Sequence, residues 1–442
     1  MKRYDEYKQT GTPWIGEIPS HWECKRLRFI CEFRNGYTPS KANPDFWTDG
    51  TIPWYRMEDI RDSGRRLNEA KQYVTEEAVK GGGLFEAGSF ILATTATIGE
   101  HAVLIVDSLA NQQFTNLKIR KSLSKEVDNE FFFYFLFVID DYCKSTTKTA
   151  TFAAVNIDDL KNFEVAIPPF DEQLKIVSYI NKVIQTYDTV ISTQERRIAL
   201  LEELKQSVIT EAVTHGINPD AKLRHSGIDW IGNIPEHWQK CRIKFIIDNH
   251  ADGIWGDEEK GNEEDINCYR VADFDYDKME IKNIIPTVRN ISKEQLAGKL
   301  VNNGDLLLEK SGGGEISPVG RVVIANISEP AVCSNFIHFL HIKSTTTLKF
   351  LCYYFNFLYS NKVNLLFFNQ TTGIQNLNIH DYLGQSIYLP PLYEQQEIVE
   401  YIESKIKPID ASIAKAKREI DLLKELKQSV ITEAVTGKIK VC

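Results

Sequence analysis

The chain has 442 residues, which is too long for a single hydrophobic core and predicts two or more domains. Apolar residues make up 43% and charged residues 26%, as in ordinary globular proteins. No apolar run reaches the ~18 residues of a membrane helix, and the first residues are too polar for a secretory signal. We therefore expect a globular cytoplasmic protein. The formal net charge of −9 excludes nucleic-acid binding through an overall basic surface, so any such contact needs local basic patches or a partner.

The first predicted element is a short opening motif that occurs twice. Residues 11–22, GTPWIGEIPSHW, return at 227–238 as GIDWIGNIPEHW, and a short basic segment follows each copy. Similarity at a long fixed offset indicates a duplicated architecture. We expect His21 and His237 in these openings to pack or to cap an element rather than to catalyse a reaction.

About 150 residues of mixed character follow each opening, and aromatic and β-branched runs in them predict much sheet. GSFIL at 88–92 matches GDLLL at 304–308, and both predict a turn that leads into a buried strand. NQQFTNLKI at 111–119 matches SNFIHFLHI at 334–342. We therefore expect two globular domains of related structure.

Each globular segment is expected to contain a helix, near 130–140 in the first and near 348–362 in the second. The segments end in IPPF and LPPL, and the paired prolines predict an extended stop. The predicted globular domains are residues 1–168 and 216–390.

A long helix follows each globular domain, at 171–214 and at 393–436, and the last twelve residues of the two copies are identical, ELKQSVITEAVT. Apolar residues recur at alternating three- and four-residue steps, the pattern of a coiled-coil seam, over predicted spacer segments 169–215 and 391–442. A 43-residue helix of this kind would be ~65 Å long. The predicted seam residues are Val177, Ile180, Ile184, Tyr187, Ile191, Ile198, Leu201, Val208, Val399, Ile402, Ile406, Ile409, Ile413, Ile420, Leu423 and Val430.

The predicted seam has polar interruptions. Lys205 and Lys427 occupy core positions, where a polar residue costs stability but can fix the register. Pro408 lies inside the second helix and should either kink it or mark its true start. Short connections through the second globular domain predict antiparallel helices with one domain held at each end. The alternative is two amphipathic helices that are buried in separate cores.

No motif predicts catalysis or a bound cofactor. The Pro-Pro pairs follow Ile167 and Leu389, which offer no acceptor for a base amino group, and SGGG at 311–314 lacks the Gly-Lys-Ser/Thr of a phosphate-binding loop. The acidic run at 257–265 is typical of a solvated loop. The eight cysteines show no metal-binding spacing, so we expect no metal and no cofactor.

Loops in which polar, basic and aromatic residues alternate remain as candidate binding sites. Arg, Lys, Asn and Gln read base edges, whereas Ser, Thr and backbone amides hold phosphates. The candidate DNA-binding residues are Arg34, Tyr37, Thr38, Lys41, Arg56, Thr94, Thr95, Thr97, Lys144, Lys148, Trp255, Arg270, Lys310, Ser311, Gly312, Gly313, Arg321, Gln370, Thr371 and Thr372.

Three features occur together: the paired W-I-G-x-I-P-x-H-W openings, the stretches NGYTPSKANPDFW, IPWYRMEDI, TTATIG and EKSGGGEISPVGRVV, and the repeated helices ending in ITEAVT. With these features the chain resembles the specificity subunit of Type I restriction-modification systems. The resemblance covers nearly the whole chain. It implies that each globular domain reads one half of a split DNA sequence and that the helices form the spacer. It also implies two bound methyltransferase subunits, restriction/translocase subunits in the full complex, and a role in defence against foreign DNA, with S-adenosylmethionine and ATP bound by the partners.

We therefore expect an α+β protein with two similar α/β target-recognition domains, joined by two long antiparallel coiled-coil helices in a pseudo-two-fold repeat. The expected function is non-catalytic recognition of an asymmetric bipartite double-stranded DNA target, because the loops of the two domains differ. One alternative is a coiled-coil scaffold whose globular domains bind protein, which the negative charge favours. Another is a fragment of a fused methyltransferase-nuclease.

Overall fold

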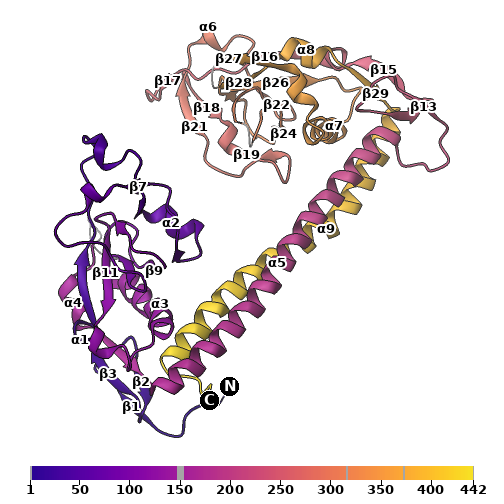
Figure 1. Ribbon diagram of the computed structural model, residues 1–442. Coiled ribbons are helices and arrows are strands. Elements are labelled where there is room, and N and C mark those ends of the chain that lie inside the picture. The colour runs from indigo at the N-terminus through magenta and orange to yellow at the C-terminus, as the bar shows by residue number, and fades with distance from the viewer. Residues whose placement is uncertain (1, 147–153, 315–316, 372–373, 442) are drawn as a thin grey trace. The chain divides into compact units, whose positions relative to one another are not determined.

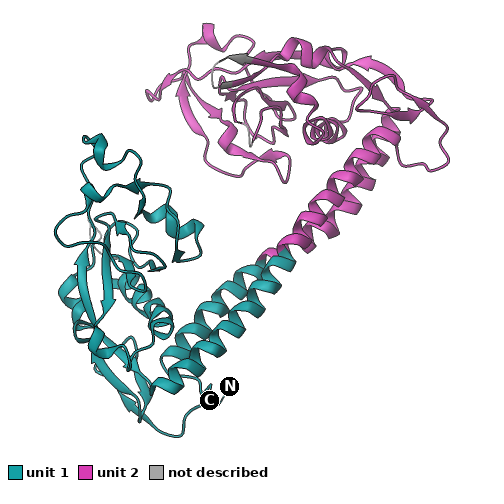
Figure 2. Cartoon of the chain, in the orientation of Figure 1, with its two compact units in different colours: residues 1–194, 418–442 teal, residues 195–417 magenta. Residues whose placement is uncertain are grey.

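The computed structural model describes residues 2–146, 154–314, 317–371 and 374–441. The chain forms two compact units, and Figure 2 colours them separately. Unit 1 comprises residues 1–194 and 418–442, and unit 2 comprises residues 195–417. The long helices α5 (Phe170–His215) and α9 (Leu392–Val435) therefore contribute one part to each unit.

Unit 1 is built on a five-stranded sheet (Figure 1). Strand β11 lies between β4 and β8 and runs antiparallel to both. All four residues of β8 are buried, which confirms the buried strand expected after the turn at 88–92. In sheet order the strands are β4 (Cys31–Asn35), β11 (Phe114–Ile119), β8 (Phe90–Ala93), β9 (His101–Leu104) and β6 (Arg66–Leu67).

Smaller elements surround this sheet. Strand β1 (Tyr7–Gln9) pairs with β2 (Glu17–Pro19), β3 (Glu23–Arg26) pairs with β12 (Glu164–Ile167), and β5 (Ile52–Tyr55) lies between β10 (Leu109–Ala110) and β7 (Tyr73–Val74). The short helices are α1 (Leu27–Ile30), α2 (Met57–Asp62) and α4 (Ile157–Asn162).

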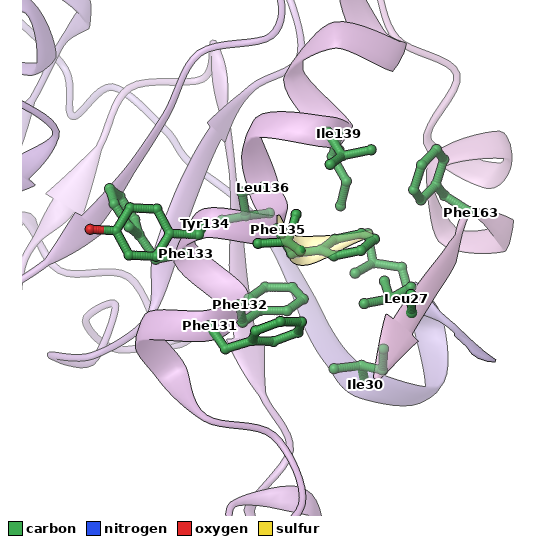
Figure 3. Packing of buried hydrophobic residues seen from close by; sticks show 14 of the residues in the cluster. Leu27, Ile30, Phe131, Phe132, Phe133, Tyr134, Phe135, Leu136, Ile139 and Phe163 are labelled. Carbon is green, nitrogen blue, oxygen red and sulfur yellow. The ribbon is translucent and has the colours of Figure 1, made fainter. Parts of the chain in front are cut away.

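Helix α3 (Asn129–Thr146) fills the core of unit 1 and confirms the helix expected near 130–140. Its start is fixed by Asp128, whose Oδ1 accepts a hydrogen bond from Phe131 N (2.9 Å). Aromatic residues run almost all round its first turns and are buried on more than one side: Figure 3 shows Phe135 beside Leu27 of α1, whereas the Phe133 ring lies 5.0 Å from the His101 ring of β9. A helix that is apolar all round is stable only inside a core, so α3 organises this domain.

Unit 2 repeats this plan. Strand β26 lies between β16 and β22 and is antiparallel to both, as β11 is to β4 and β8. The expected helix near 348–362 is α7 (Leu348–Ser360). In order, the six-stranded sheet comprises β16 (Ile247–Asp252), β26 (Ile337–Ile342), β22 (Leu306–Glu309), β24 (Val322–Ile324), β20 (Glu280–Ile281) and β19 (Phe274–Asp275).

Unit 2 also has smaller sheets. Strand β13 (Leu223–His225) pairs with β14 (Asn233–Pro235), and β15 (Gln239–Arg242) pairs with β29 (Ser386–Leu389). One further sheet has the order β17 (Asp257–Glu258), β21 (Thr287–Asn290), β18 (Asp265–Tyr269), β25 (Val332–Cys333), and another has the order β23 (Ser311–Gly313), β28 (Ile374–Leu377), β27 (Phe368–Thr371). The short helices are α6 (Lys293–Leu296) and α8 (Ile379–Gly384). The acidic run at 257–265, expected to be a loop, is largely exposed but includes β17.

Helices α5 and α9 pack against each other in both units, and all sixteen predicted seam residues are buried or half-buried. In unit 1 Lys427 Nζ lies 2.7 Å from Asp188 Oδ1, and in unit 2 Lys205 Nζ lies 2.7 Å from Asp410 Oδ1. Rising numbers on one helix therefore meet falling numbers on the other, which confirms the antiparallel pairing. The alternative of two helices in separate cores is wrong.

Pro408 does not mark the start of the second helix, because α9 begins at Leu392 and continues through Pro408. Proline lacks the N–H that would bond to the carbonyl of Ser404, one turn earlier. Pro408 is exposed, so water can satisfy that carbonyl, and Ser412 Oγ donates to Pro408 O (2.8 Å) on the following turn. The seam residues on both sides keep the helix continuous.

The identical ends of the two helices are part of the globular cores. In unit 1 Ile431 and Val435 of α9 belong to the same buried cluster as Trp22 of the first opening motif. In unit 2 Ile209 of α5 belongs to the same cluster as Trp238 of the second. Both repeated motifs therefore have a structural explanation, because one packs against the other in each unit.

The histidines of the openings also have a structural role. His21 Nε2 lies 3.0 Å from Glu172 in the first turn of α5, and His237 Nε2 lies 2.7 Å from Glu394 in the first turn of α9. Trp238 Nε1 donates a second hydrogen bond to Glu394 (3.0 Å). Carboxylates are favoured at helix N-termini, so these contacts anchor each helix start to its opening motif.

Candidate nucleic-acid interface

Each unit has a short turn where its central sheet meets a neighbouring sheet. In unit 1 the turn comprises residues 111–113 and connects β10 to β11. Asn111 N donates to Tyr55 O (3.1 Å) at the end of β5, and Thr94 N donates to Gln113 O (2.9 Å) directly after β8. The backbone of the turn is therefore held by the ends of two buried strands.

In unit 2 the corresponding turn comprises residues 334–336 and connects β25 to β26. Ser334 N donates to Tyr269 O (2.8 Å) at the end of β18, and Lys310 N donates to Phe336 O (2.9 Å) directly after β22. These two bonds reproduce the two bonds of unit 1 position by position. The turn is thus a duplicated feature of the fold.

A glycine lies against each turn. A Cβ atom at Gly36 would lie 2.1 Å from Asn111 O, and one at Gly253 would lie 2.2 Å from Cys333 O. No side chain fits at such distances, so glycine is required where the chain leaves β4 and β16 and passes the turn. The residues that follow these glycines are thereby brought beside the turn.

In unit 1 the turn displays carboxamide groups. Asn111 and Gln113 bond to each other, through Gln113 N to Asn111 Oδ1 (3.0 Å) and Asn111 Nδ2 to Gln113 Oε1 (3.2 Å). Gln112 between them is exposed, and the Thr38 hydroxyl donates to its Oε1. Beneath them Thr94 Oγ1 lies 3.1 Å from the hydroxyl of the neighbouring strand residue Thr115. The surface of the turn is therefore polar and uncharged.

In unit 2 charged groups occupy the corresponding positions. In the central sheet of unit 2, His338 of β26 pairs with Asp252 of β16. In unit 1 the corresponding pair is Thr115 of β11 with Asn35 of β4. Asp252 accepts hydrogen bonds from His338 Nδ1 (2.7 Å) and from Lys310 Nζ (2.7 Å). The hydrogen bond from His338, together with that from Lys310, lowers the pKa of the Asp252 carboxyl far below its usual range.

Beside the 334–336 turn lies a largely apolar hollow of about 520 Å³. Four of the candidate residues line it, namely Trp255, Arg270, Ser311 and Gly312. Phe336 of the turn, 44% exposed, forms part of its wall, and a Cβ at Gly312 would lie 3.3 Å from the Phe336 ring. The structure thus brings these candidates together with an aromatic residue that was not among them.

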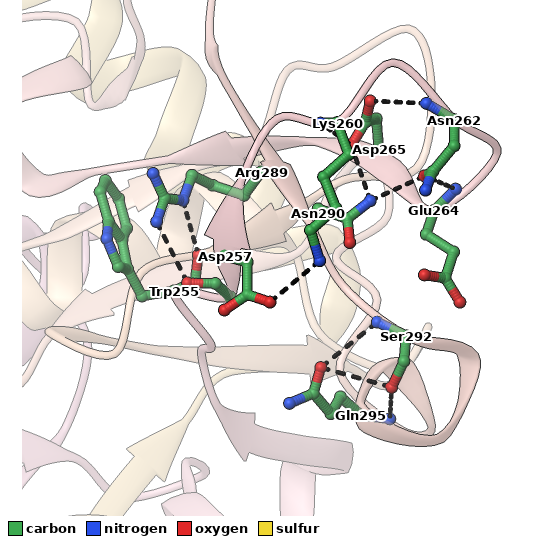
Figure 4. A network of polar contacts seen from close by, with 11 residues as sticks. Trp255, Asp257, Lys260, Asn262, Glu264, Asp265, Arg289, Asn290, Ser292 and Gln295 are labelled. Atoms are coloured by element: carbon green, nitrogen blue, oxygen red, sulfur yellow. Dashed lines mark hydrogen bonds and ion pairs between the residues drawn. The ribbon is translucent and has the colours of Figure 1, made fainter.

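Trp255 is held by a polar network that Figure 4 shows. Arg289 Nε donates to Trp255 O (3.0 Å), and its guanidinium lies 4.4 Å from the centre of the Trp255 ring. The next residue, Asn290, donates to Asp265 Oδ1 (2.9 Å) of the acidic run. Part of the acidic run therefore supports the wall of the hollow.

Two candidate arginines are engaged within the protein. The Arg34 guanidinium donates to the carbonyls of Gly83 (2.5 Å) and Leu84 (3.2 Å), and so holds a loop in place. Arg321 donates to Glu309 Oε2 (3.2 Å), and burial raises the pKa of that carboxyl although Arg321 opposes the shift. These two side chains stabilise their domains.

The other candidates are spread over several elements. Three of them have partners within unit 1: Arg56 forms an ion pair with Glu58, Tyr37 donates to Ala78 O (3.1 Å), and Thr95 forms a β-bridge with Ala154. Lys41 is exposed before η1 (Pro44–Phe46), Thr97 is half-buried after β8, and Lys144 lies in the last turn of α3. In unit 2 Gly313 is in β23 and Gln370 and Thr371 are in β27, whereas Lys148 and Thr372 lie outside the described residues.

Gln112, Asn335 and Phe336 are exposed on this surface and are not among the candidates predicted from the sequence. The alignment of NQQF at 111–114 with SNFI at 334–337 contained the signal, because it sets Gln112 opposite Asn335. Within the described segments no group of three His, Cys, Asp or Glu side chains is placed to hold a metal ion. None of the helices described combines the length and apolar content needed to cross a membrane.

Comparison with known proteins places this architecture in a family. The family model described as Type I restriction modification DNA specificity domain matches residues 19–202 and again 235–422. Each match covers one globular domain with much of the helix that follows it. The duplication seen in the fold is therefore a duplication of this domain.

Individual relatives are named as members of the same family. The EcoprrI specificity subunit of Escherichia coli is 41% identical over 162 residues, which span 37% of this chain and 40% of that relative. The MjaIX specificity subunit of Methanocaldococcus jannaschii is 23% identical over 99% of this chain and 97% of its own length. A chain from a structure of complex assembly and conformational transition of the type I R-M system has the same fold, with a TM-score of 0.67 and 18% identity over 96% of this chain and 99% of that one.

Proposed function

The chain belongs to the Type I restriction modification DNA specificity family, whose role is DNA-target recognition, and we propose that it reads an asymmetric bipartite target, one half with each domain. The observation that carries this proposal is the duplicated turn. Its backbone is held alike in both units, whereas its side chains differ. A common scaffold with different exposed groups suits the reading of two different half-sites.

The difference between the two surfaces is chemical. Gln112 and Thr38 present neutral hydrogen-bonding groups in unit 1. In unit 2 the exposed ring of Phe336 lies on a surface that also carries two ion pairs, Arg270 with Asp273 and Lys310 with Asp252. Arg and Lys suit guanine, carboxamides suit adenine, and an aromatic edge suits the thymine methyl. The half-sites should therefore differ in base composition.

The coiled coil would set the separation of the half-sites. The paired helices are long, their seam residues are buried or half-buried, and duplicated ion pairs fix their register. A rigid spacer between two readers implies unread base pairs between the half-sites. In this proposal the two target-reading domains are residues 1–168 and 216–390, and the two spacer segments are residues 169–215 and 391–442.

Partner subunits would bind the outer face of the helices. Leu200 and Leu204 on α5 are 57% and 51% exposed, and Leu422 and Leu426 on α9 are 57% and 45% exposed. The two pairs occupy the same positions of the duplicated sequence, one turn apart on each helix. Two equal apolar stripes suit two copies of one partner, which we assign to the methyltransferase subunit.

Catalysis then belongs to the partners. The chain would act without metal, S-adenosylmethionine or ATP of its own, in the cytoplasm, and restriction/translocase subunits would join the full complex. The alternative of a scaffold whose globular domains bind protein gains no support from the relatives, which are named as specificity subunits. The other alternative, a fragment of a fused enzyme, likewise gains no support from these relatives, because each is named as a specificity subunit.

The test counts bound methyltransferase subunits by native mass spectrometry. The wild-type chain should bind two. Replacing both Leu200 and Leu204 with Ser, or both Leu422 and Leu426, should leave one, and all four changes should leave none. Arg196→Ser, an exposed change on the same helix, is the control and should still bind two. Two bound copies on the fourfold variant would refute the assignment.

A further inference from the structure

We infer that the middle residues of the two turns, Gln112 and Asn335, each read an adenine, one in each half-site. This inference rests on the proposed function and assigns a base to particular side chains. Both positions carry a carboxamide although the neighbouring turn residues differ between the units. Carboxamides pair with adenine in the major groove, where one amide oxygen accepts from N6 and the amide nitrogen donates to N7.

The exposure of these residues supports the assignment. Gln112 and Asn335 are exposed, whereas the residues that follow the turns, Phe114 and Ile337, are fully buried as the first residues of central strands. The turns are therefore anchored from below, and their middle residues point outward. Because the backbone of each turn is already fixed, binding orders only the side chain and not the loop, which favours selective readout.

The hydrogen bonds within unit 1 leave Gln112 suitable for this pairing. Asn111 and Gln113 satisfy each other, so their amides are engaged within the turn. Thr38 uses one lone pair of Gln112 Oε1. The second lone pair remains, and among the described residues Gln112 Nε2 has no hydrogen-bond partner, so one acceptor and two donors face outward.

Thr38 is accordingly a positioning residue. Its hydroxyl fixes the orientation of the Gln112 amide, so that the acceptor and donor are presented in one arrangement. Gly36 brings Thr38 to this place, because only glycine allows the chain to pass so close to the turn. Serine keeps this hydroxyl and alanine removes it, so the two substitutions separate orientation of the amide from the bulk of the side chain.

The test uses the full chain with its methyltransferase subunit and selects bound duplexes from a randomised pool. Gln112→Ala should relax the preference for adenine at one position of one half-site by about 5- to 150-fold. Asn335→Ala should do the same at one position of the other half-site. Thr38→Ala should weaken the same position as Gln112→Ala, and Thr38→Ser should restore it. Gln9→Ala, an exposed carboxamide on β1, is the control and should leave the target unchanged.

Thermal unfolding of every variant shows whether it is folded. Unchanged selection by folded Gln112→Ala and Asn335→Ala would overturn the inference, and so would relaxation at positions where the wild-type chain selects a base other than adenine. Relaxation of both half-sites by one substitution would also overturn it. Failure of the proposed function looks different, because the wild-type complex itself would then enrich no sequence.

Discussion

The packing of each helix end into a globular core leads to a pair of matched substitutions. Ile431 of α9 is 2% exposed in the core of unit 1, and Ile209 of α5 is 1% exposed in the core of unit 2. The two residues occupy the same position of the identical helix ends. Ile431→Ala should therefore destabilise unit 1, and Ile209→Ala should destabilise unit 2.

The size of the effect follows from burial. Isoleucine to alanine in a packed core costs about 2–5 kcal/mol, from lost burial and from the cavity that remains. About 3 kcal/mol corresponds to roughly a hundredfold increase in the equilibrium constant for local opening. Leu426→Ala and Leu204→Ala are controls on the same helices, because those side chains are about half exposed, and each should cost at most about 1 kcal/mol.

Hydrogen exchange followed by mass spectrometry measures the opening of each unit separately. Ile431→Ala should speed exchange in α3 of unit 1, and Ile209→Ala should speed exchange in α7 of unit 2. Unchanged exchange in α3 of the Ile431→Ala variant would contradict a role for Ile431 in the core of unit 1, as would equal effects of Ile431→Ala and Leu426→Ala.

Three further predictions concern the joints, the pH dependence and the spacer. Glu394→Ala should lower the stability of unit 2 by about 1–3 kcal/mol, because it leaves the buried Trp238 N–H without its acceptor, and a melt that matches wild type would contradict this. Burial lowers the pKa of the His101 imidazole although Asp140 (2.7 Å) opposes the shift, so unit 1 should lose stability as pH falls below the unfolded pKa of about 6.5. His101→Gln should show a shallower loss of stability below about pH 6.5 in melts at a series of pH values, and an unchanged loss would contradict this. The spacer can be lengthened by inserting seven residues after Gln194 and seven more before Glu419, to which Gln194 is hydrogen-bonded across the seam (3.1 Å). Each insertion adds ~10 Å, so the unread gap should lengthen by up to about three base pairs. Changed half-sites with an unchanged gap would contradict the spacer role.

Much of the fold could be predicted because it depends on local patterns. The seven-residue spacing of apolar residues from Val177 to Val208 predicts the seam, and the helix expected near 130–140 is present as α3. Lys205 and Lys427 could be recognised as register-setting residues, but their partners could not, since local spacing does not reveal which residue lies across the seam.

The remaining features depend on contacts between distant segments. The repeated ITEAVT looked like the end of a seam, yet its apolar residues complete domain cores with Trp22 and Trp238, more than 400 residues and about 30 residues away in the chain. Arg34 had the composition of a DNA contact but bonds to backbone carbonyls of a loop 49 residues later. Gln112 cannot be identified from the sequence because an isolated carboxamide has no distinctive pattern, and only the fold places it on an exposed turn.

Two domains of one chain should read two different half-sites across a fixed gap. The most direct measurement is selection of duplexes from a fully randomised pool by the complex of this chain with its methyltransferase subunit. We expect one enriched motif with two unlike half-sites, separated by a constant number of unread base pairs. A continuous motif, two identical half-sites or a variable gap would contradict it.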